Sequence, residues 1–386
     1  MKRGKATQSI HGNRDKEFRS VNYPIFQTTS FGVTKSDDYN RFINDDEDFF
    51  IYTRYRNPTI KNVEQKLAKL ENAESAVVFS SGMAAISSTI MSFVKNGDVI
   101  AAANRLYGMT FRFLRDYATK YGISIKFLSE EELYRVNTTV PDAKLVYFET
   151  PINPTTECIS ITRIVEAAKQ IDAKTIIDNT FASPINQNPI DFGVDIVVHS
   201  ATKYLGGHSD IMAGAAIGSK KDIKQIHSTL KAFGGCINPI DAYLLDRSLK
   251  TLKARVENQN SNAYKLAKFF EKEEKIEKVF YPGLKSSPSY EIAKSQMSGF
   301  GAIIAIELES LESAKILCDN LNVVLNATSL GSVETLVSIP LLTSHIKLNE
   351  TELKEAGVIS GMVRVSVGLE DIDDLIEDFK QALAKI

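Results

Sequence analysis

The stretch Thr175-Ile176-Ile177-Asp178-Asn179 is an apolar run that ends on an acidic residue, and Ser200-Ala201-Thr202-Lys203-Tyr204-Leu205-Gly206-Gly207-His208-Ser209-Asp210 follows it. Between them, residues 196–199 form a second short apolar run. Short apolar runs of this kind predict buried strands. The two runs therefore predict two strands, with a carboxylate at the end of the first and a lysine flanked by small hydroxyl residues soon after the second.

Strands and helices alternate along the part of the chain that leads to this stretch. Besides residues 174–178 and 196–199, the sequence predicts strands at 76–79, 98–103, 123–128 and 145–149. Helical patterns begin at Asn57-Pro58-Thr59 and occur at residues 84–94, 107–121 and 161–171. Alternation of this kind implies a mostly parallel sheet covered on both faces by helices. The predicted fold class is α/β.

The order of elements changes after Leu249. A long polar helix pattern comes first, and then a strand at 302–308, a helix at 311–321, a strand at 363–367 and a terminal helix with one apolar stripe. This order predicts a second, smaller α+β domain. A chain of 386 residues that is 43% hydrophobic is long enough for two or perhaps three domains. We expect an N-terminal arm at residues 1–57, an α/β domain at 58–249 and a C-terminal α+β domain at 250–386.

The expected arm contains the acidic and aromatic stretch Asp45-Asp46-Glu47-Asp48-Phe49-Phe50. It is interpreted either as a solvated loop or as an arm that grips another subunit.

Charge and composition exclude several classes of partner. Lys and Arg number 46 against 48 Asp and Glu, so the net charge is −2 and no basic field is available for nucleic acid or an anionic membrane. The N-terminal residues are polar, and no run is long enough to cross a bilayer. Cys158, Cys236 and Cys318 lie far apart, which argues against structural zinc and a disulfide framework and favours a reduced cytoplasm.

The histidines show no paired ligand spacing, so no metal site is expected. His199 is interpreted as a strand residue beside the site.

Lys203 and Asp178 together suggest the chemistry of pyridoxal 5'-phosphate (PLP). A lysine can form an imine with the aldehyde of this cofactor, and an ionised aspartate can keep its ring nitrogen protonated. After exchange with substrate, the freed Lys203 amine can shuttle protons. Taken alone, Lys203 would more often be a solvated surface charge, and Asp178 a turn residue. The hypothesis therefore depends on receptors for the rest of the cofactor.

The sequence supplies candidates to bind the phosphate. Ser80-Ser81-Gly82-Met83 connects a predicted strand to a predicted helix, so the amides of Gly82 and Met83 offer oriented donors at a helix start. Ser200 and Thr202 can add hydroxyl groups from one side of an extended segment. Arg54 can add a full positive charge.

Tyr107 is the candidate aromatic lid on the cofactor ring, because Gly108 after it lets the backbone approach closely. The alternative is a core aromatic residue at a helix start.

Seven segments, in order along almost the whole chain, resemble the Cys/Met-metabolism family of PLP enzymes, which includes cystathionine γ-synthase, cystathionine γ-lyase and methionine γ-lyase. Any single segment is weak evidence, but seven in register are specific. They are Tyr52-Thr53-Arg54-Tyr55-Arg56-Asn57-Pro58-Thr59, Ser81-Gly82-Met83-Ala84-Ala85, Leu106-Tyr107-Gly108, Glu149-Thr150-Pro151-Ile152-Asn153-Pro154, Asp178-Asn179-Thr180, Ser200-Ala201-Thr202-Lys203-Tyr204 and Arg364-Val365-Ser366-Val367-Gly368-Leu369-Glu370.

The resemblance implies the aspartate-aminotransferase-like fold, fold type I, and an active dimer within a homotetramer. Residues matching Tyr52 and Arg54 reach the cofactor phosphate of a neighbouring subunit, which favours the subunit-gripping interpretation of the arm. The residue matching Tyr107 stacks on the pyridine ring.

For the substrate side, the resemblance implies three further roles. The residue matching Asn153 contacts the phenolic oxygen side of the cofactor, and the residue matching Arg364 holds the substrate α-carboxylate. Ser329 matches a serine that helps orient the catalytic lysine and the substrate.

The reaction implied is γ-elimination on methionine, homocysteine or cystathionine, which yields 2-oxobutanoate, ammonia and a thiol. Lys203 would remove the α-proton, and Tyr107 would assist the leaving group. The main alternative is γ-replacement, as in cystathionine γ-synthase or an O-acylhomoserine thiol transferase. A β-lyase or a PLP-binding regulator without turnover are further alternatives.

Four positions bear on the substrate. Ile51 and Thr328 stand where cystathionine-handling members commonly have glutamates that can pair with the distal ammonium, which favours an apolar thioether such as methionine. Arg112 matches an arginine that can receive a distal carboxylate, and Met109 stands where many methionine γ-lyases have cysteine. These last two positions favour cystathionine, so the substrate stays open.

Overall fold

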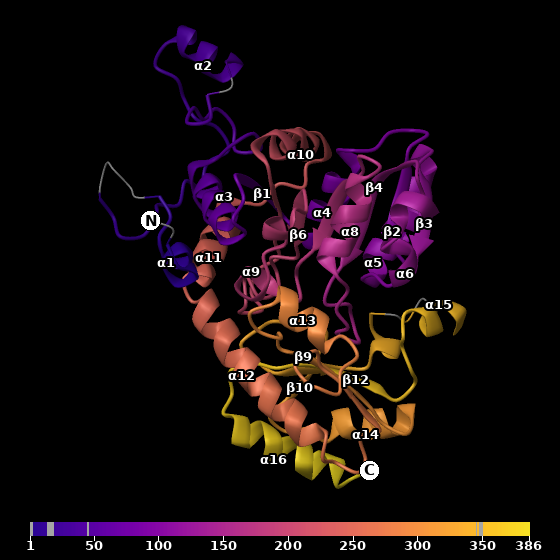
Figure 1. The fold of residues 1–386 in the computed structure, drawn as a ribbon. Coiled ribbons are helices and arrows are strands. Elements are labelled where there is room, and N and C mark those ends of the chain that lie inside the picture. The colour runs from indigo at the N-terminus through magenta and orange to yellow at the C-terminus, as the bar shows by residue number, and fades with distance from the viewer. Residues whose placement is uncertain (1–2, 14–18, 45, 345, 347–349) are drawn as a thin grey trace.

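Two sheets with flanking helices make up the protein (Figure 1), whose computed structural model describes residues 3–13, 19–44, 46–344, 346 and 350–386. The larger sheet has seven strands in the order β1-β7-β6-β5-β4-β2-β3. Its strands are β1 (Ser75–Phe79), β2 (Val99–Ala103), β3 (Ser124–Leu128), β4 (Ala143–Glu149), β5 (Lys174–Asp178), β6 (Ile196–His199) and β7 (Gly214–Gly218).

The larger sheet is mostly parallel, as the alternation of elements predicts. β2 pairs in parallel with β3 and β4, and β4, β5 and β6 continue in parallel. β7 runs antiparallel to both of its neighbours, β1 and β6. The carboxyl ends of the parallel strands therefore meet along one edge, where open α/β sheets bind their ligands.

The sequence analysis did not predict β7, because it consists mainly of glycine and alanine. These small residues allow a close approach: a Cβ on Gly214 would lie 2.1 Å from the carbonyl oxygen of Ser81. Strand propensity reflects side-chain packing, so it does not predict a strand whose small residues allow close backbone contact.

Helices pack on this sheet and bury its strands. α4 packs on β6 and β7, α8 on β5, and α10 and α3 on β1. Asn57 caps α3, since its side chain accepts a hydrogen bond from the amide of Thr59, as the predicted helix start requires. The helices of this part of the chain are α3 (Pro58–Leu70), α4 (Gly82–Met91), α5 (Gly108–Arg112), η2 (Phe113–Tyr117), η3 (Ala118–Tyr121), α6 (Glu130–Leu133), α7 (Val136–Thr139), α8 (Ile161–Lys169), α9 (Ser183–Asn186), η4 (Pro189–Phe192) and α10 (Lys220–Phe233).

The predicted helix at residues 107–121 is observed as one continuous helical segment whose hydrogen-bonding pattern changes along its length. It begins as the α-helix α5, widens into the π-helical turn η2 and tightens into the 3-10 turn η3.

The second sheet has the order β10-β11-β12-β9-β8 and is antiparallel except between β10 and β11. α12 packs on β9 and α16, and α14 packs on β12 and α16. The elements of this part are α11 (Pro239–Leu249), α12 (Leu252–Phe270), β8 (Lys278–Phe280), α13 (Tyr290–Gln296), β9 (Ile303–Glu307), α14 (Leu311–Asp319), β10 (Leu325–Asn326), β11 (Leu336–Ser338), η5 (Pro340–Leu342), α15 (Glu350–Glu355), β12 (Met362–Ser366) and α16 (Ile372–Leu383).

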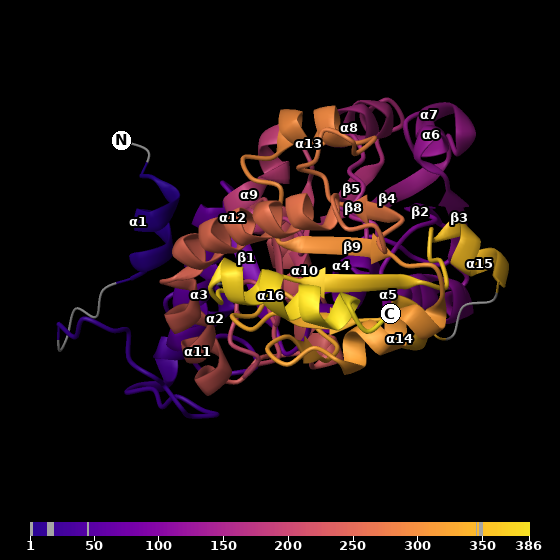
Figure 2. The same cartoon turned by 90° about the horizontal axis from the view of Figure 1, so that it is seen from below.

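The arrangement in space separates the two sheets and joins them by one long helix. The smaller sheet lies below the larger one in Figure 1, and in the view from below α16 lies in front of the smaller sheet (Figure 2). α12 runs from α11 beside the larger sheet down to α16 (Figure 1).

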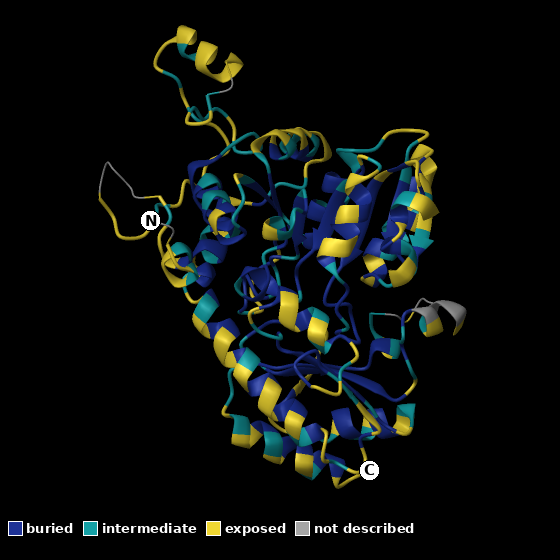
Figure 3. Cartoon of the chain, viewed as in Figure 1, coloured by how far each residue is buried: buried dark blue, intermediate teal, exposed yellow. Residues whose placement is uncertain are grey.

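The N-terminal segment divides into a packed part and a projecting part. α1 (Lys5–Ile10) packs on α3 and α12 of the same chain. η1 (Ser36–Asp38) and α2 (Tyr39–Ile43) stand away from the body and are almost wholly exposed (Figure 3). Residues 1–2, 14–18 and 45 of the expected arm lie outside the described residues.

Candidate active site

Polar residues end three adjacent strands of the larger sheet. Glu149 ends β4, Asp178 ends β5 and His199 ends β6, and the register pairs Glu149 with Asp178. All three side chains are buried. A cavity of about 750 Å³ opens at this edge, between the larger sheet and residues of the C-terminal part of the chain.

This cavity gathers most of the residues that the sequence singled out. The predicted site residues that line it are Gly82, Met83, Tyr107, Arg112, Asn153, Asp178, Ser200, Thr202, Lys203, Thr328, Ser329 and Arg364. Ile51, Tyr52 and Arg54 are not among its lining residues.

The Lys203 amine lies inside the cavity and donates a hydrogen bond to Ser329 Oγ at 2.8 Å. Burial, and next the charge of Arg364, lower the pKa of Lys203 from 10.5 to about 8. Both effects disfavour the ammonium form. A fraction of the amine is therefore neutral and nucleophilic close to neutral pH, far more than for a solvated lysine.

Ser329 has a φ of +95°, in the left-handed region that L residues rarely adopt. The strained backbone brings its hydroxyl to Lys203 and its carbonyl oxygen to Arg364, whose Nη2 donates to it at 2.9 Å.

Arg364 comes from β12 of the smaller sheet and is 7% exposed. Its Nη1 donates to Asn153 Oδ1 at 3.1 Å, so the guanidinium is held between Asn153 and the Ser329 carbonyl. Burial lowers the pKa of Arg364 to about 10, which still leaves it charged at neutral pH. A fixed and desolvated guanidinium is suited to bind a carboxylate.

Asp178 is 9% exposed and accepts a hydrogen bond from the amide of Thr180 at 2.9 Å. Burial raises the pKa of this carboxyl, while the hydrogen bonds from Thr180 and the charge of His199 lower it. The sequence analysis expected Asp178 to stay ionised, and burial acts against that expectation. The groups around Asp178 therefore decide its charge.

The start of α4 meets the strand that precedes Lys203. Ser81 caps this ten-residue helix by accepting from the amide of Ala84, and Gly82 follows it. A Cβ on Gly82 would lie 2.8 Å from both Cβ and Oγ of Ser200. Only glycine lets the helix amides and the Ser200 hydroxyl share one small space.

Thr202 has a structural contact as well as a place in the cavity. Its hydroxyl accepts from the amide of Ala213 at 2.9 Å and donates to the carbonyl of the same residue at 3.2 Å. These bonds tie the lysine segment to the start of β7.

Tyr107 precedes α5 and is 39% exposed, facing the cavity. The Glu149 carboxyl group accepts a hydrogen bond from the Tyr107 amide at 3.0 Å and so fixes the backbone of the aromatic residue. Burial, and next the charge of Asp178, raise the pKa of Glu149 to about 8. This role of Glu149 was not predicted, because the sequence of a strand does not show which distant group will donate a hydrogen bond to its last side chain.

The cavity also has apolar lining residues. They include Met109, Met212, Leu342 and Ile346, and Arg112 and Thr328 line the cavity as well. Arg112 is engaged locally: its Nη1 lies 3.7 Å from Met109 Sδ, and its Nε lies 3.9 Å from an Asp116 carboxylate oxygen.

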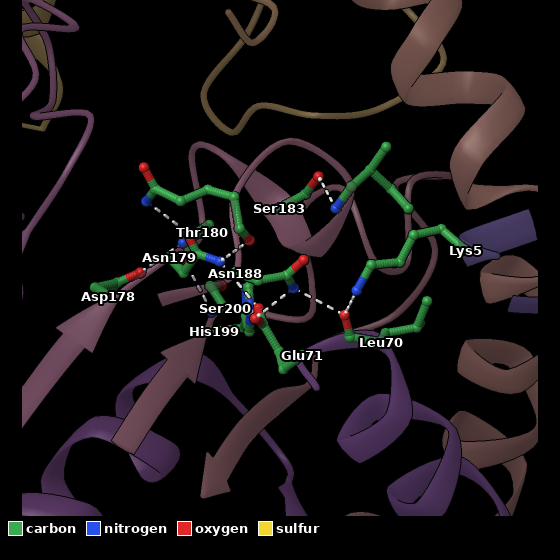
Figure 4. A network of polar contacts seen from close by, with 12 residues as sticks. Lys5, Leu70, Glu71, Asp178, Asn179, Thr180, Ser183, Asn188, His199 and Ser200 are labelled. Atoms are coloured by element: carbon green, nitrogen blue, oxygen red, sulfur yellow. Dashed lines mark hydrogen bonds and ion pairs between the residues drawn. The ribbon is translucent and has the colours of Figure 1, made fainter. Parts of the chain in front are cut away.

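Behind the cavity, a network of polar side chains continues from Asp178 (Figure 4). His199, expected as a strand residue beside the site, ends β6 and forms a 2.6 Å contact with Glu71. The sequence analysis missed Glu71, since an acidic residue at a helix end is usually solvated.

Tyr52 and Arg54 belong to the N-terminal segment and lie away from the cavity of their own chain. Arg54 Nη1 donates to the carbonyl of Lys231 at 2.7 Å, and its guanidinium lies 5.6 Å from the Tyr52 ring centroid.

Within the described residues, no group of three or more His, Cys, Asp or Glu side chains is arranged to hold a metal ion. No described helix is long and apolar enough to span a membrane. The three cysteines are free thiols.

The comparisons with known proteins agree over the full length of the chain. Residues 6–384 match a family model described as Cys/Met metabolism PLP-dependent enzyme. The L-methionine γ-lyase of Treponema denticola is 40% identical over 392 residues, which cover 100% of this chain and 98% of the relative. A cystathionine β-lyase of Lactococcus lactis subsp. cremoris is 39% identical over 386 residues, covering 98% of each.

A solved structure gives the same picture. The cystathionine γ-synthase of Xanthomonas oryzae pv. oryzae, solved in complex with aminoacrylate and cysteine, superposes with a TM-score of 0.94 at 31% identity, covering 100% of this chain and 99% of that one.

Proposed function

Because the chain belongs to the family of Cys/Met-metabolism PLP-dependent enzymes, we propose that its cavity carries out γ-elimination on a sulfur amino acid. The reaction consumes one water and releases 2-oxobutanoate, ammonia and a thiol. The observation that carries the proposal is the placement of the Lys203 amine, the Asp178 carboxyl and the Arg364 guanidinium in one cavity.

The residues present fit PLP. The buried carboxyl of Asp178 needs a cationic partner to remain ionised, and a protonated ring nitrogen provides one. The cradle between Gly82 and Ser200, which a Cβ would fill, suits a phosphate at the start of α4. Tyr107 offers an aromatic face, and Lys203 offers an amine with a lowered pKa.

When bound, PLP supplies an electron sink for the charge that develops at the substrate α-carbon. The chain's own residues position the substrate and move its protons. Arg364 binds the α-carboxylate, and Asn153 and the Ser329 carbonyl hold its guanidinium in place. Ser329 Oγ directs the Lys203 amine, which takes the α-proton.

Tyr107 is the second proton-moving group of the proposal. Burial raises the pKa of Tyr107, so its hydroxyl keeps its proton near neutral pH and can give it to the departing sulfur. The bond between Glu149 and the Tyr107 amide holds the ring at the cavity while it does so.

Among sulfur amino acids, we propose methionine, a short apolar thioether, as the preferred substrate. Met109, Met212, Leu342 and Ile346 give the γ-substituent an apolar wall. Thr328 offers no charge to a distal ammonium, and Asp116 already neutralises Arg112 in part. A second amino-acid head group, as in cystathionine, would have both of its charges poorly matched.

We also propose that the active unit is a dimer within a homotetramer, in the cytoplasm. The segment around α2 projects from the body and exposes large apolar side chains, with Phe42 at 39% and Ile43 at 74%. Tyr52 and Arg54 lie outside the cavity of their own chain. We therefore propose that both side chains reach the cavity of a second copy of the chain. Three free thiols accord with a reducing compartment.

The substrate panel tests the reaction. Purified protein with PLP is given methionine, homocysteine, cystathionine, or O-acetylhomoserine plus cysteine, and both keto acid and thiol are quantified. We expect 2-oxobutanoate and methanethiol from methionine, with a higher kcat/KM than for cystathionine. Pyruvate from cystathionine would indicate β-elimination, and cystathionine formed from the acylated substrate would indicate γ-replacement. Either result as the dominant activity would refute the proposal.

Mixing inactive variants tests the dimer. Arg54→Ala and Lys203→Ala damage different halves of a shared site, so each alone should be nearly inactive. Mixed in equal amounts and allowed to exchange subunits, they should recover about a quarter of the native sites. No recovery after verified exchange would place Arg54 in its own chain's site.

A further inference from the structure

Glu71 is a carboxylate that the proposed reaction does not use and that is buried behind the cavity. It follows α3, is 1% exposed and accepts three hydrogen bonds. Its Oε1 accepts from His199 Nε2 at 2.6 Å and from Asn179 Nδ2 at 2.9 Å, and its Oε2 accepts from Asn188 Nδ2 at 3.1 Å. Figure 4 shows these bonds converging on Glu71.

The network joins this carboxylate to the end of β5. Asn179, which donates to Glu71, directly follows Asp178, and its amide donates to the Val198 carbonyl at 3.0 Å. Thr180 donates its amide to Asp178 and accepts from the amide of Ser200 at 2.9 Å. Asp178 and His199 therefore end neighbouring strands whose loops are tied together.

Glu71 and Asp178 are two buried carboxyl groups in one polar network, and as carboxylates they need positive partners. A charge that is buried without a partner costs several kcal/mol, so buried charges are paired or neutralised. His199 is 1% exposed, contacts Glu71 directly and interacts electrostatically with Asp178. An imidazolium at His199 supplies one positive charge that contacts Glu71 and acts on Asp178, and the ring nitrogen of the cofactor would supply a second.

Other titratable groups also face Asp178. Burial raises the pKa of Glu149 to about 8, so this carboxyl carries its proton near neutral pH and adds no full charge. Burial likewise raises the pKa of Tyr147 and Tyr107, and both stay neutral there. Among these described neighbours, His199 is thus the group that can balance Asp178 from the protein side.

We propose that Glu71 and His199 are positioning residues that hold Asp178 as the carboxylate which keeps the PLP ring nitrogen protonated. Glu71 stabilises the imidazolium, and the imidazolium stabilises the Asp178 carboxylate. This inference rests on the proposed PLP site. A buried ion pair adds little stability compared with well-packed apolar residues. Holding the charge of Asp178 gives the buried Glu71–His199 pair a functional role.

The test measures the proton on the ring nitrogen rather than turnover. Enzyme is loaded with PLP labelled with 15N in the ring, and solid-state NMR follows that nitrogen over pH in the wild type, in His199→Asn and in Glu71→Gln. We expect the apparent pKa of the ring nitrogen to fall by at least about one unit in both variants, which is tenfold in proton affinity. The dissociation constant of PLP should rise about tenfold, since each variant weakens the Asp178 charge.

A buried ion pair that does not line the cavity supplies the matched control. Lys66 and Asp246 are 2.6 Å apart, with side chains 1% and 8% exposed, and neither lines the cavity. Lys66→Met should destabilise the fold without changing the ring nitrogen. If His199→Asn does not fold, the near-isosteric Glu71→Gln carries the test.

The outcomes separate this inference from the proposed function. A ring nitrogen that titrates as in the wild type in both variants would overturn the inference and leave the PLP site intact. The same change in Lys66→Met would also overturn it, because general loosening would then explain the effect. A wild-type protein that binds no PLP would overturn both.

Discussion

Replacing Lys203 by methionine should stabilise the cofactor-free protein. Burial and Arg364 lower the pKa of Lys203 from 10.5 to about 8. That difference corresponds to roughly 3 kcal/mol by which the native state disfavours the ammonium. The amine also donates a hydrogen bond to Ser329, whose loss costs about 1 kcal/mol. The expected net gain for Lys203→Met is about 2 kcal/mol near neutral pH.

The pH dependence of this gain has a definite sign. Below the native pKa of about 8 the amine is charged in both folded and unfolded chains, so the wild type bears the full cost of burial. Between that pH and 10.5 the native amine is neutral while the unfolded one is still charged, so the cost declines. The advantage of Lys203→Met should therefore be complete near pH 7 and small above pH 10.5.

Urea denaturation of cofactor-free protein measures this prediction. Wild type and Lys203→Met are compared at one protein concentration, because assembly contributes to apparent stability. Both proteins are measured near pH 7 and near pH 10.5, and their thermal midpoints at these two pH values provide a second readout. A variant that is less stable than the wild type at neutral pH, or a gain that grows with pH, would refute the reasoning.

Three further substitutions follow from the site. Tyr107→Phe should keep PLP bound and lower kcat for γ-elimination by about 10² to 10⁴, the range of a lost general acid; an unchanged kcat would remove Tyr107 from proton transfer. Arg364→Lys should raise KM for methionine by about tenfold or more, because a point charge replaces a planar fork held by Asn153 and the Ser329 carbonyl, and an unchanged KM would place the α-carboxylate elsewhere. Gly82→Ala should weaken PLP binding by about 10- to 100-fold, since its Cβ would lie 2.8 Å from Ser200 Oγ; PLP titration checks this, and native affinity would contradict the phosphate cradle.

The sequence predicted the strands that bury branched side chains. β5 and β6 are runs of valine and isoleucine between polar residues, and such runs reveal both the strand and its ends. β7 was not predicted, because it is rich in glycine and alanine and its Gly214 lies against the backbone of Ser81. The short strands β8, β10 and β11 have only two or three residues each, too few for a periodic pattern.

The candidate site was predictable where a residue's chemistry is itself unusual. A lysine between hydroxyls and a carboxylate at a strand end can be recognised locally, and Lys203 and Asp178 do lie in one cavity. The roles of Glu149 and Glu71 were not predictable, because each is defined by the hydrogen bonds that its carboxyl group accepts from distant segments. Tyr52 and Arg54 lie outside their own cavity, so their contribution depends on a second chain.

The central claim is that PLP attaches covalently to the amine of Lys203. Borohydride reduction of the PLP-loaded protein, followed by peptide mass spectrometry, locates the attached group directly. We expect one pyridoxyl phosphate on the peptide that contains Lys203 and none on the other lysines. Attachment to a different lysine, or no attachment to protein that binds PLP, would contradict it.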